Sequence, residues 1–173
     1  MRREHGFTIL ELLVVVGIIV LMTILILPNW RSGERTLALD RVVHKAGQDV
    51  RRAQELALRA EIHSCITGTL RGYGVYFSQN SPTSYIIFAE CSGNFEYSPG
   101  MDDIVETLSL ESNIEIVSVN PSPAVSILFI PPIPLVFIKP QDPPSTQVSF
   151  QRTDGVGGVK ILDINSKGVI DID

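Results

Sequence analysis

The chain has 173 residues, of which 45% are hydrophobic and 19% are charged, with a formal net charge of −5. This length supports one ordinary domain with a core, and so high an apolar content excludes disorder as a description of the whole chain. The acidic balance excludes nucleic-acid binding through bulk positive charge, and the two cysteines, Cys65 and Cys91, exclude a disulfide-dense scaffold or a four-cysteine zinc site.

The apolar residues concentrate near the N-terminus, where residues 7–27 read FTILELLVVVGIIVLMTILIL. As a helix this segment would be about 31 Å long, which matches the hydrocarbon thickness of a bilayer. A single strand would leave its backbone unpaired in lipid, so the segment predicts a transmembrane helix. Arg2 and Arg3 ahead of it predict a cytoplasmic N-terminus. The run is too long for a secretory signal peptide, and no small-residue cleavage site follows it.

Glu11 is the one charged residue in this segment. A carboxylate inside a membrane span costs free energy and usually has a function. One alternative is that Glu11 lies close enough to the interface to reach water. The other is that cleavage before Phe7 creates an α-ammonium, which Glu11 of a neighbouring subunit would meet. Such a buried pair would fix the register of an assembly rather than add stability.

The sequence GFTILE at residues 6–11, followed by LLVVVGIIVLMTILILP, resembles the class III leader of type IV pilins and type II secretion pseudopilins. The resemblance implies that residues 1–6 are a leader, which prepilin peptidase cleaves between Gly6 and Phe7 before Phe7 is N-methylated. It also implies a kink at Pro28. The mature chain would be anchored once in the bacterial inner membrane with its globular part outside. It would then join other pilin or pseudopilin subunits in a filament through an inner-membrane assembly platform.

Residues 28–62 continue as an amphipathic helix, which we expect from about Arg35 to Glu61. Arg51, Arg52 and Arg59 are interleaved with acidic residues and predict a solvated face rather than a binding patch. The apolar positions recur at steps of three and four residues: Leu39, Val42, Val43, Ala46, Val50, Ala53, Leu56, Ala57 and Ala60.

Residues 63–173 change to short β-like runs separated by Gly, Pro, Asn and Ser, which predicts an antiparallel, sandwich-like β domain. The predicted fold class is therefore α+β, a long N-terminal helix packed on this domain. Residues 135–138 lie between proline-rich segments and are typical of an edge strand or of a buried connector. The ten expected strands are 64–70, 73–78, 84–89, 105–110, 114–120, 125–130, 135–138, 147–152, 159–164 and 169–172.

The sequence predicts no enzyme, no cofactor and no metal site. His44 and His63 would lie about 28 Å apart along a helix, too far to share a ligand. The glycines at 155–158 predict a hairpin turn, and residues 165–168 predict a β-turn rather than a calcium loop. Cys65 and Cys91 would lie outside the cytoplasm, where we predict a disulfide between them, the alternative being two free buried thiols.

The run LALDRVVHKAGQDVRRAQELALRAEI followed by YGVYF is similar to the H-type minor pseudopilins (GspH) and the FimT-like minor pilins. This resemblance implies a minor pilin or pseudopilin that primes or joins a type IV pilus-like or type II secretion filament. A DNA-uptake or adhesive minor pilin is one alternative, and an unprocessed single-pass membrane protein is another. The last 22 residues hold three basic and four acidic side chains, so direct binding of nucleic acid is not expected.

Overall fold

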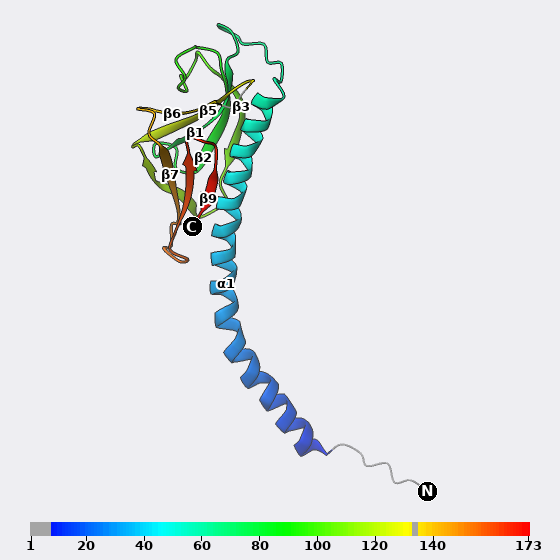
Figure 1. Ribbon diagram of the computed structural model, residues 1–173. Helices are drawn as coiled ribbons and strands as arrows, with labels where there is room; N and C mark the ends of the chain where they lie inside the picture. Colours follow the sequence, from blue (N-terminus) through cyan, green and yellow to red (C-terminus); the bar gives the residue numbers. More distant parts are fainter. Residues whose placement is uncertain (1–7, 133–134) are drawn as a thin grey trace.

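The computed structural model describes residues 8–132 and 135–173, with the backbone alone across 27–32. One long helix, α1 (Ile9–Leu58), lies along a β-rich head with its C-terminal half and projects away from the head with its N-terminal half (Figure 1). The head is built from antiparallel sheets. This arrangement confirms the predicted α+β fold class.

Helix α1 ends at Leu58, three residues before the expected end at Glu61. Ala60 has a φ of +46°, its N–H donates to the carbonyl of Ala57, and the N–H of Glu61 donates to the carbonyl of Leu56. These two bonds form a Schellman motif, which satisfies the last helical carbonyls and turns the chain out of the helix. Ala60 therefore lies past the helix and is exposed, whereas the pattern had placed it in the apolar stripe.

The described part of the head contains nine strands in two antiparallel sheets. One sheet has five strands in the order β3-β2-β1-β5-β6, and the other has four in the order β4-β7-β8-β9. The predicted edge position of residues 135–138 is confirmed, because β6 ends the five-stranded sheet. The strands are β1 (Gly72–Ser78), β2 (Ser84–Glu90), β3 (Asp103–Ser109), β4 (Ile114–Asn120), β5 (Ala124–Ile130), β6 (Leu135–Lys139), β7 (Ser145–Arg152), β8 (Val159–Asn165) and β9 (Ile170–Ile172).

The strand expected at residues 64–70 is wrong, because this segment is irregular in the structure. One of its backbone N–H groups, that of Ile66, bonds to a side chain instead of to a neighbouring strand. The N–H of Ile66 donates to the Asp103 carboxylate at 3.2 Å, and Gly68 has a φ of +78°, which an extended strand does not allow. The apolar and β-branched composition of the segment suggested a strand, but no sheet edge receives it.

The core lies between the C-terminal half of α1 and the facing sides of both sheets. Val43, Ala46 and Val50 on α1 are completely buried, as are Phe77 on β1 and Leu162 on β8. The predicted apolar stripe of the helix is confirmed over most of its length. Ion pairs also join α1 to the head: Arg35–Asp154, Arg41–Glu111, Arg52–Glu106 and Asp40–Lys160.

A buried polar contact reinforces this packing. The Tyr85 hydroxyl donates to the Asp49 carboxylate of α1 at 2.6 Å, and both residues are at least nine-tenths buried. Burial, followed by the hydrogen bond and charge of Asp49, raises the pKa of Tyr85 far above its usual value, so the hydroxyl stays protonated and donates.

We expect Tyr85→Phe to lower the free energy of unfolding by about 1–3 kcal/mol, because the buried Asp49 carboxylate loses its donor. Denaturant unfolding of the full chain in detergent micelles measures this loss. Tyr73→Phe is the matched control, since the Tyr73 hydroxyl donates to the carbonyl of Glu61, an exposed residue past the helix end where water replaces the bond. Equal losses of unfolding free energy in the two variants would show that the Tyr85–Asp49 contact contributes no more to stability than the Tyr73–Glu61 bond.

Candidate assembly interface on helix α1

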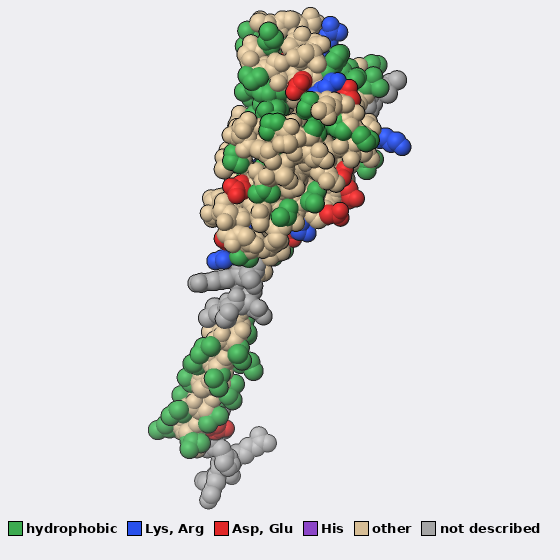
Figure 2. All heavy atoms as spheres, turned by 90° about the vertical axis from the view of Figure 1, so that its left-hand side faces the viewer, with side chains coloured by type: hydrophobic (Ala, Val, Ile, Leu, Met, Phe, Trp, Pro, Cys, Tyr) green, Lys and Arg blue, Asp and Glu red, His purple; other side chains and the backbone are tan. Residues whose placement is uncertain are grey.

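The N-terminal half of α1 is an apolar surface with no protein around it. Residues Ile9–Ile26 have a mean hydropathy of 3.1, and none of these 18 residues is buried. Their large apolar side chains are each between 45% and 86% exposed, and Figure 2 shows hydrophobic side chains along the visible face of the lower helix. Monomeric soluble proteins rarely expose so large a continuous apolar surface. The segment is long and apolar enough to cross a membrane.

The exposure of this segment is uniform around the helix axis. A helix that docks on one partner has one apolar stripe, whereas a helix that is apolar on all sides is surrounded in its final environment. Both a bilayer and the core of a helical bundle provide such an environment. The geometry therefore defines a surface for insertion or assembly rather than a one-sided contact.

The helix begins with a side-chain cap that includes Glu11. Thr8 is extended and forms the N-cap, and its hydroxyl accepts a hydrogen bond from the backbone N–H of Glu11 at 3.3 Å. The spacing Thr-x-x-Glu is that of a capping box, a signal that our sequence analysis missed. Glu11 also lies in the first turn, where the positive end of the helix dipole favours a carboxylate.

Glu11 is exposed, and it is the one ionisable side chain between Ile9 and Ile26. Thr23 is a second polar residue in the described span. Its hydroxyl donates a hydrogen bond to the carbonyl of Ile19 at 2.7 Å, so it has a hydrogen-bond partner within its own helix. Because Thr23 is satisfied locally and Glu11 carries a charge, Glu11 is the group in this span that most needs a partner from outside the chain.

The processing residues Gly6 and Phe7 lie outside the described residues, and so does the side chain of Pro28. The helix backbone continues without interruption through position 28. The expected pairing of Glu11 with the Phe7 ammonium of a neighbour and the kink at Pro28 stay predictions.

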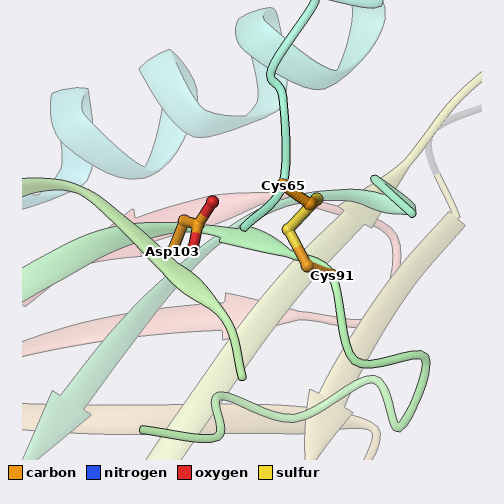
Figure 3. A group of neighbouring side chains, drawn as sticks. All are labelled: Cys65, Cys91 and Asp103. Carbon is orange, nitrogen blue, oxygen red and sulfur yellow. A yellow bond between two sulfur atoms is a disulfide. The ribbon is translucent and has the colours of Figure 1, made fainter. Parts of the chain in front are cut away.

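At the opposite end of the head, the segment that follows α1 is attached to the sheet through Cys65, Cys91 and Asp103 (Figure 3). Cys65 and Cys91 form a disulfide in the structure, with their Cα atoms 5.9 Å apart. Asp103 lies beside it and accepts hydrogen bonds at one oxygen from the Ile66 N–H and, at 2.9 Å, from the His63 ring. Cysteines bind metal as thiolates, so this oxidised cluster is a structural clamp and not a metal site.

The two turns predicted in the C-terminal part are confirmed. The glycines at 155–158 connect β7 to β8, which pair in antiparallel fashion. Residues 165–168 connect β8 to β9, where the N–H of Gly168 donates to the carbonyl of Asn165 at 2.9 Å. Two basic side chains nearby are paired with acids, Arg152 with Asp154 and Lys160 with Asp40, whereas Lys167 in the second turn has no ion pair among the described residues.

The fold and this surface define a class of protein with a separately packed head carried on a helix that can anchor in a membrane. Residues 1–27 match the family model described as "Prokaryotic N-terminal methylation motif". Comparisons with curated protein sequences and with solved structures gave no match. The motif supports a processed subunit of the type IV pilin and pseudopilin family, and it points to a structural role rather than an enzymatic one. It implies processing by prepilin peptidase and assembly with other pilins.

Proposed function

We propose that the protein is a minor pilin or pseudopilin of the H-type or FimT-like class, which primes or joins a type IV pilus-like or type II secretion filament. The single observation that carries this proposal is the junction of the methylation motif at residues 1–27 with a helix whose apolar part, Ile9–Ile26, is free of its own head. A subunit whose helix lies first in a bilayer and later in a filament core needs a helix that is apolar on all sides and not covered by its own head.

The head supports the minor class. Nine described strands in two sheets form it, whereas the resemblance leads us to expect about four strands in a major pilin. The Cys65–Cys91 disulfide suits a head outside the cytoplasm, in an oxidising compartment. The proposed orientation therefore has a cytoplasmic N-terminus, one membrane span and an extracytoplasmic head, which later lies on the filament surface.

The paired cations argue for a structural subunit over a DNA receptor. Phosphate binding depends on a cluster of uncompensated positive charge. In the described residues, Arg152 and Lys160 of the C-terminal hairpin each lie within ion-pair distance of a carboxylate. Arg52 and Arg59 of the helix cluster are likewise paired, with Glu106 and Glu55, which leaves Arg51 as the one member of that cluster without an ion pair among the described residues.

The N-terminal mass of the protein tests the processing step. In cells that contain prepilin peptidase, we expect the chain to begin at Phe7 and to carry one extra methyl group, and in cells without the enzyme we expect residues 1–6 to be retained. Gly6→Asp should block cleavage, because the resemblance places Gly6 at the scissile bond, and Arg2→Ala is the control that should still be cleaved. A chain that keeps Met1 in the presence of the peptidase would contradict the proposal.

A further inference from the structure

The outer face of the five-stranded sheet, on the side away from α1, carries an aromatic residue, Tyr76, that a neighbouring loop contacts. Antiparallel pairing places Tyr76 on β1 beside Ile86 on β2 and Ser126 on β5. The loop between β2 and β3, residues 91–102, reaches this face. Tyr97 of the loop has its ring centroid 4.8 Å from that of Tyr76, and its N–H donates to the Ser126 hydroxyl at 3.0 Å.

This loop is held in place by buried carboxylates. Glu90 accepts hydrogen bonds from the N–H of Gly93 and the hydroxyl of Ser92, and Asp102 accepts from the N–H groups of Cys91 and Ser98. Both carboxylates are at least 95% buried. Tyr97 is therefore fixed before any ligand arrives, which lowers the entropic cost of binding.

A cavity of about 310 Å³ lies beside Tyr97 on this face. Its apolar and aromatic lining comes from Tyr76, Tyr85, Ile86, Tyr97, Pro99 and Ile104. Its volume falls at the lower end of the range of small-molecule sites. The faces of aromatic rings carry negative charge density and attract weakly positive C–H groups, so this lining suits a ligand with a flat C–H surface.

Part of the lining is polar and has free hydrogen-bonding capacity. Asn80 and Ser81 come from the turn between β1 and β2, and Ser84 is the first residue of β2. Their side chains form no hydrogen bond with any residue that the structure describes, and neither do the hydroxyls of Tyr76 and Tyr97. Two tyrosine hydroxyls, two serine hydroxyls and one amide thus converge on one cavity with their donors and acceptors unused.

Burial, together with the neighbouring Tyr76 and Asp102, raises the pKa of Tyr97, so its hydroxyl is protonated and can donate at neutral pH. Among the described residues, no charged side chain lines the cavity. A phosphate or a carboxylate would find no cation here, and a purely apolar ligand would leave the polar groups without partners. The ligand that fits is neutral, rich in hydroxyl groups and apolar on one face.

We propose that this cavity binds a neutral saccharide, with a sugar ring against Tyr76 and Tyr97 and its hydroxyls bonded to Asn80, Ser81 and Ser84. A pyranose ring has the required chemistry, since its C–H groups gather on one face and its hydroxyls project around the edge. The head would then contact glycans or polysaccharides independently of its proposed place in a filament.

Calorimetric titration of the full chain with neutral trisaccharides tests this proposal. The protein is kept in a zwitterionic detergent, because alkyl glycoside detergents carry sugar headgroups that would compete. The probes are maltotriose, cellotriose and N,N′,N″-triacetylchitotriose, with trigalacturonate as the anionic comparison. We expect at least one neutral probe to bind with a dissociation constant of about 1 mM or tighter, and trigalacturonate to bind about tenfold more weakly or worse.

Three variants locate the binding to the cavity. Tyr76→Ala removes an aromatic face, Ser84→Trp fills the space, and the double variant Asn80→Ala/Ser81→Ala removes hydrogen bonds at two exposed positions that the fold does not need. Each should weaken binding by about tenfold. Tyr73→Phe, on the opposite face of β1, should bind like the unchanged protein. Absence of binding by all three neutral probes, equal binding of trigalacturonate, or unchanged binding by the folded double variant would overturn the proposal.

Discussion

Replacing Glu11 by leucine is expected to leave membrane insertion and processing intact and to reduce incorporation into filaments by about tenfold or more. The substitution removes the one charge between Ile9 and Ile26, so the helix enters the bilayer more easily. It also leaves the proposed Phe7 ammonium of the neighbouring subunit without its counter-charge in the filament core. Removing one partner of a buried ion pair costs several kcal/mol, far more than the pair itself contributes.

The experiment separates insertion from assembly. The amount of protein is measured in the membrane fraction and in the sheared filament fraction, and the ratio of the two is compared between variants. Glu11→Gln keeps the length and hydrogen-bonding capacity of the side chain but not its charge, so it should fail as Glu11→Leu does. Thr23→Val is the matched control, because the Thr23 hydroxyl bonds to the carbonyl of Ile19 in the same helix. Its incorporation should be unchanged.

The place of Glu11 in the first helical turn gives a rival explanation that the same assay tests. The hydroxyl of Thr8 accepts the backbone N–H of Glu11 and the Glu11 carboxylate lies at the positive end of the helix dipole, so a weaker helix start is the other route to lost incorporation. Thr8→Ala removes this bond and leaves the charge of Glu11. If Thr8→Ala is excluded from filaments as strongly as Glu11→Leu, or if Glu11→Gln is incorporated normally, the charge-pairing hypothesis is wrong.

The parts of the fold that follow from periodic patterns could be predicted from the sequence. The three- and four-residue spacing of Val43, Ala46 and Val50 identified the buried face of α1, because one helix packs its apolar stripe on one core. Short β-like runs bounded by turn residues, such as 73–78, identified strands, since Gly, Pro, Asn and Ser interrupt the chain between strands. Local turn chemistry likewise identified the hairpin at 155–158.

The parts that depend on single contacts could not be predicted in this way. The segment 64–70 has the composition of a strand, but its disulfide to Cys91 and its bonds to Asp103 decide its conformation. The end of α1 uses Ala60 at a positive φ, where glycine is the usual signal. The loop at 91–102 is ordered by the buried Glu90 and Asp102, and charged residues are seldom expected in a core.

The residues around the proposed binding cavity could not be predicted from the sequence for the same reason. Tyr76, Ser84 and Tyr97 come from β1, β2 and the loop that follows β2, and nothing in their spacing shows that they meet. Sheet register places Tyr76 beside Ile86, and the loop then adds Tyr97. By contrast, the capping box at Thr8 and Glu11 is a local pattern, and a search for Thr-x-x-Glu ahead of the apolar run would have found it.

Removing the disulfide is expected to have the largest effect on the stability of the head. Cys65 and Cys91 are 26 residues apart in the chain, and in the chain-entropy model a crosslink of this length stabilises the folded state by about 3–4 kcal/mol. The double variant Cys65→Ala/Cys91→Ala should lose that amount in denaturant unfolding of the full chain in zwitterionic micelles. Alanine is chosen because position 91 is buried and a serine hydroxyl there would add a cost of its own.

His63→Ala is the matched comparison, because His63 attaches the same part of the chain to the adjacent strand β3 by a contact with Asp103. Partly exposed ion pairs contribute about 1 kcal/mol or less, so this variant should be much less affected than the double cysteine variant. Adding a reductant should lower the stability of the unchanged protein to that of the double variant and leave the double variant unaffected. A loss of about 1 kcal/mol or less in the double variant would show that the contacts of Asp103 with His63 and Ile66 hold the segment without the disulfide.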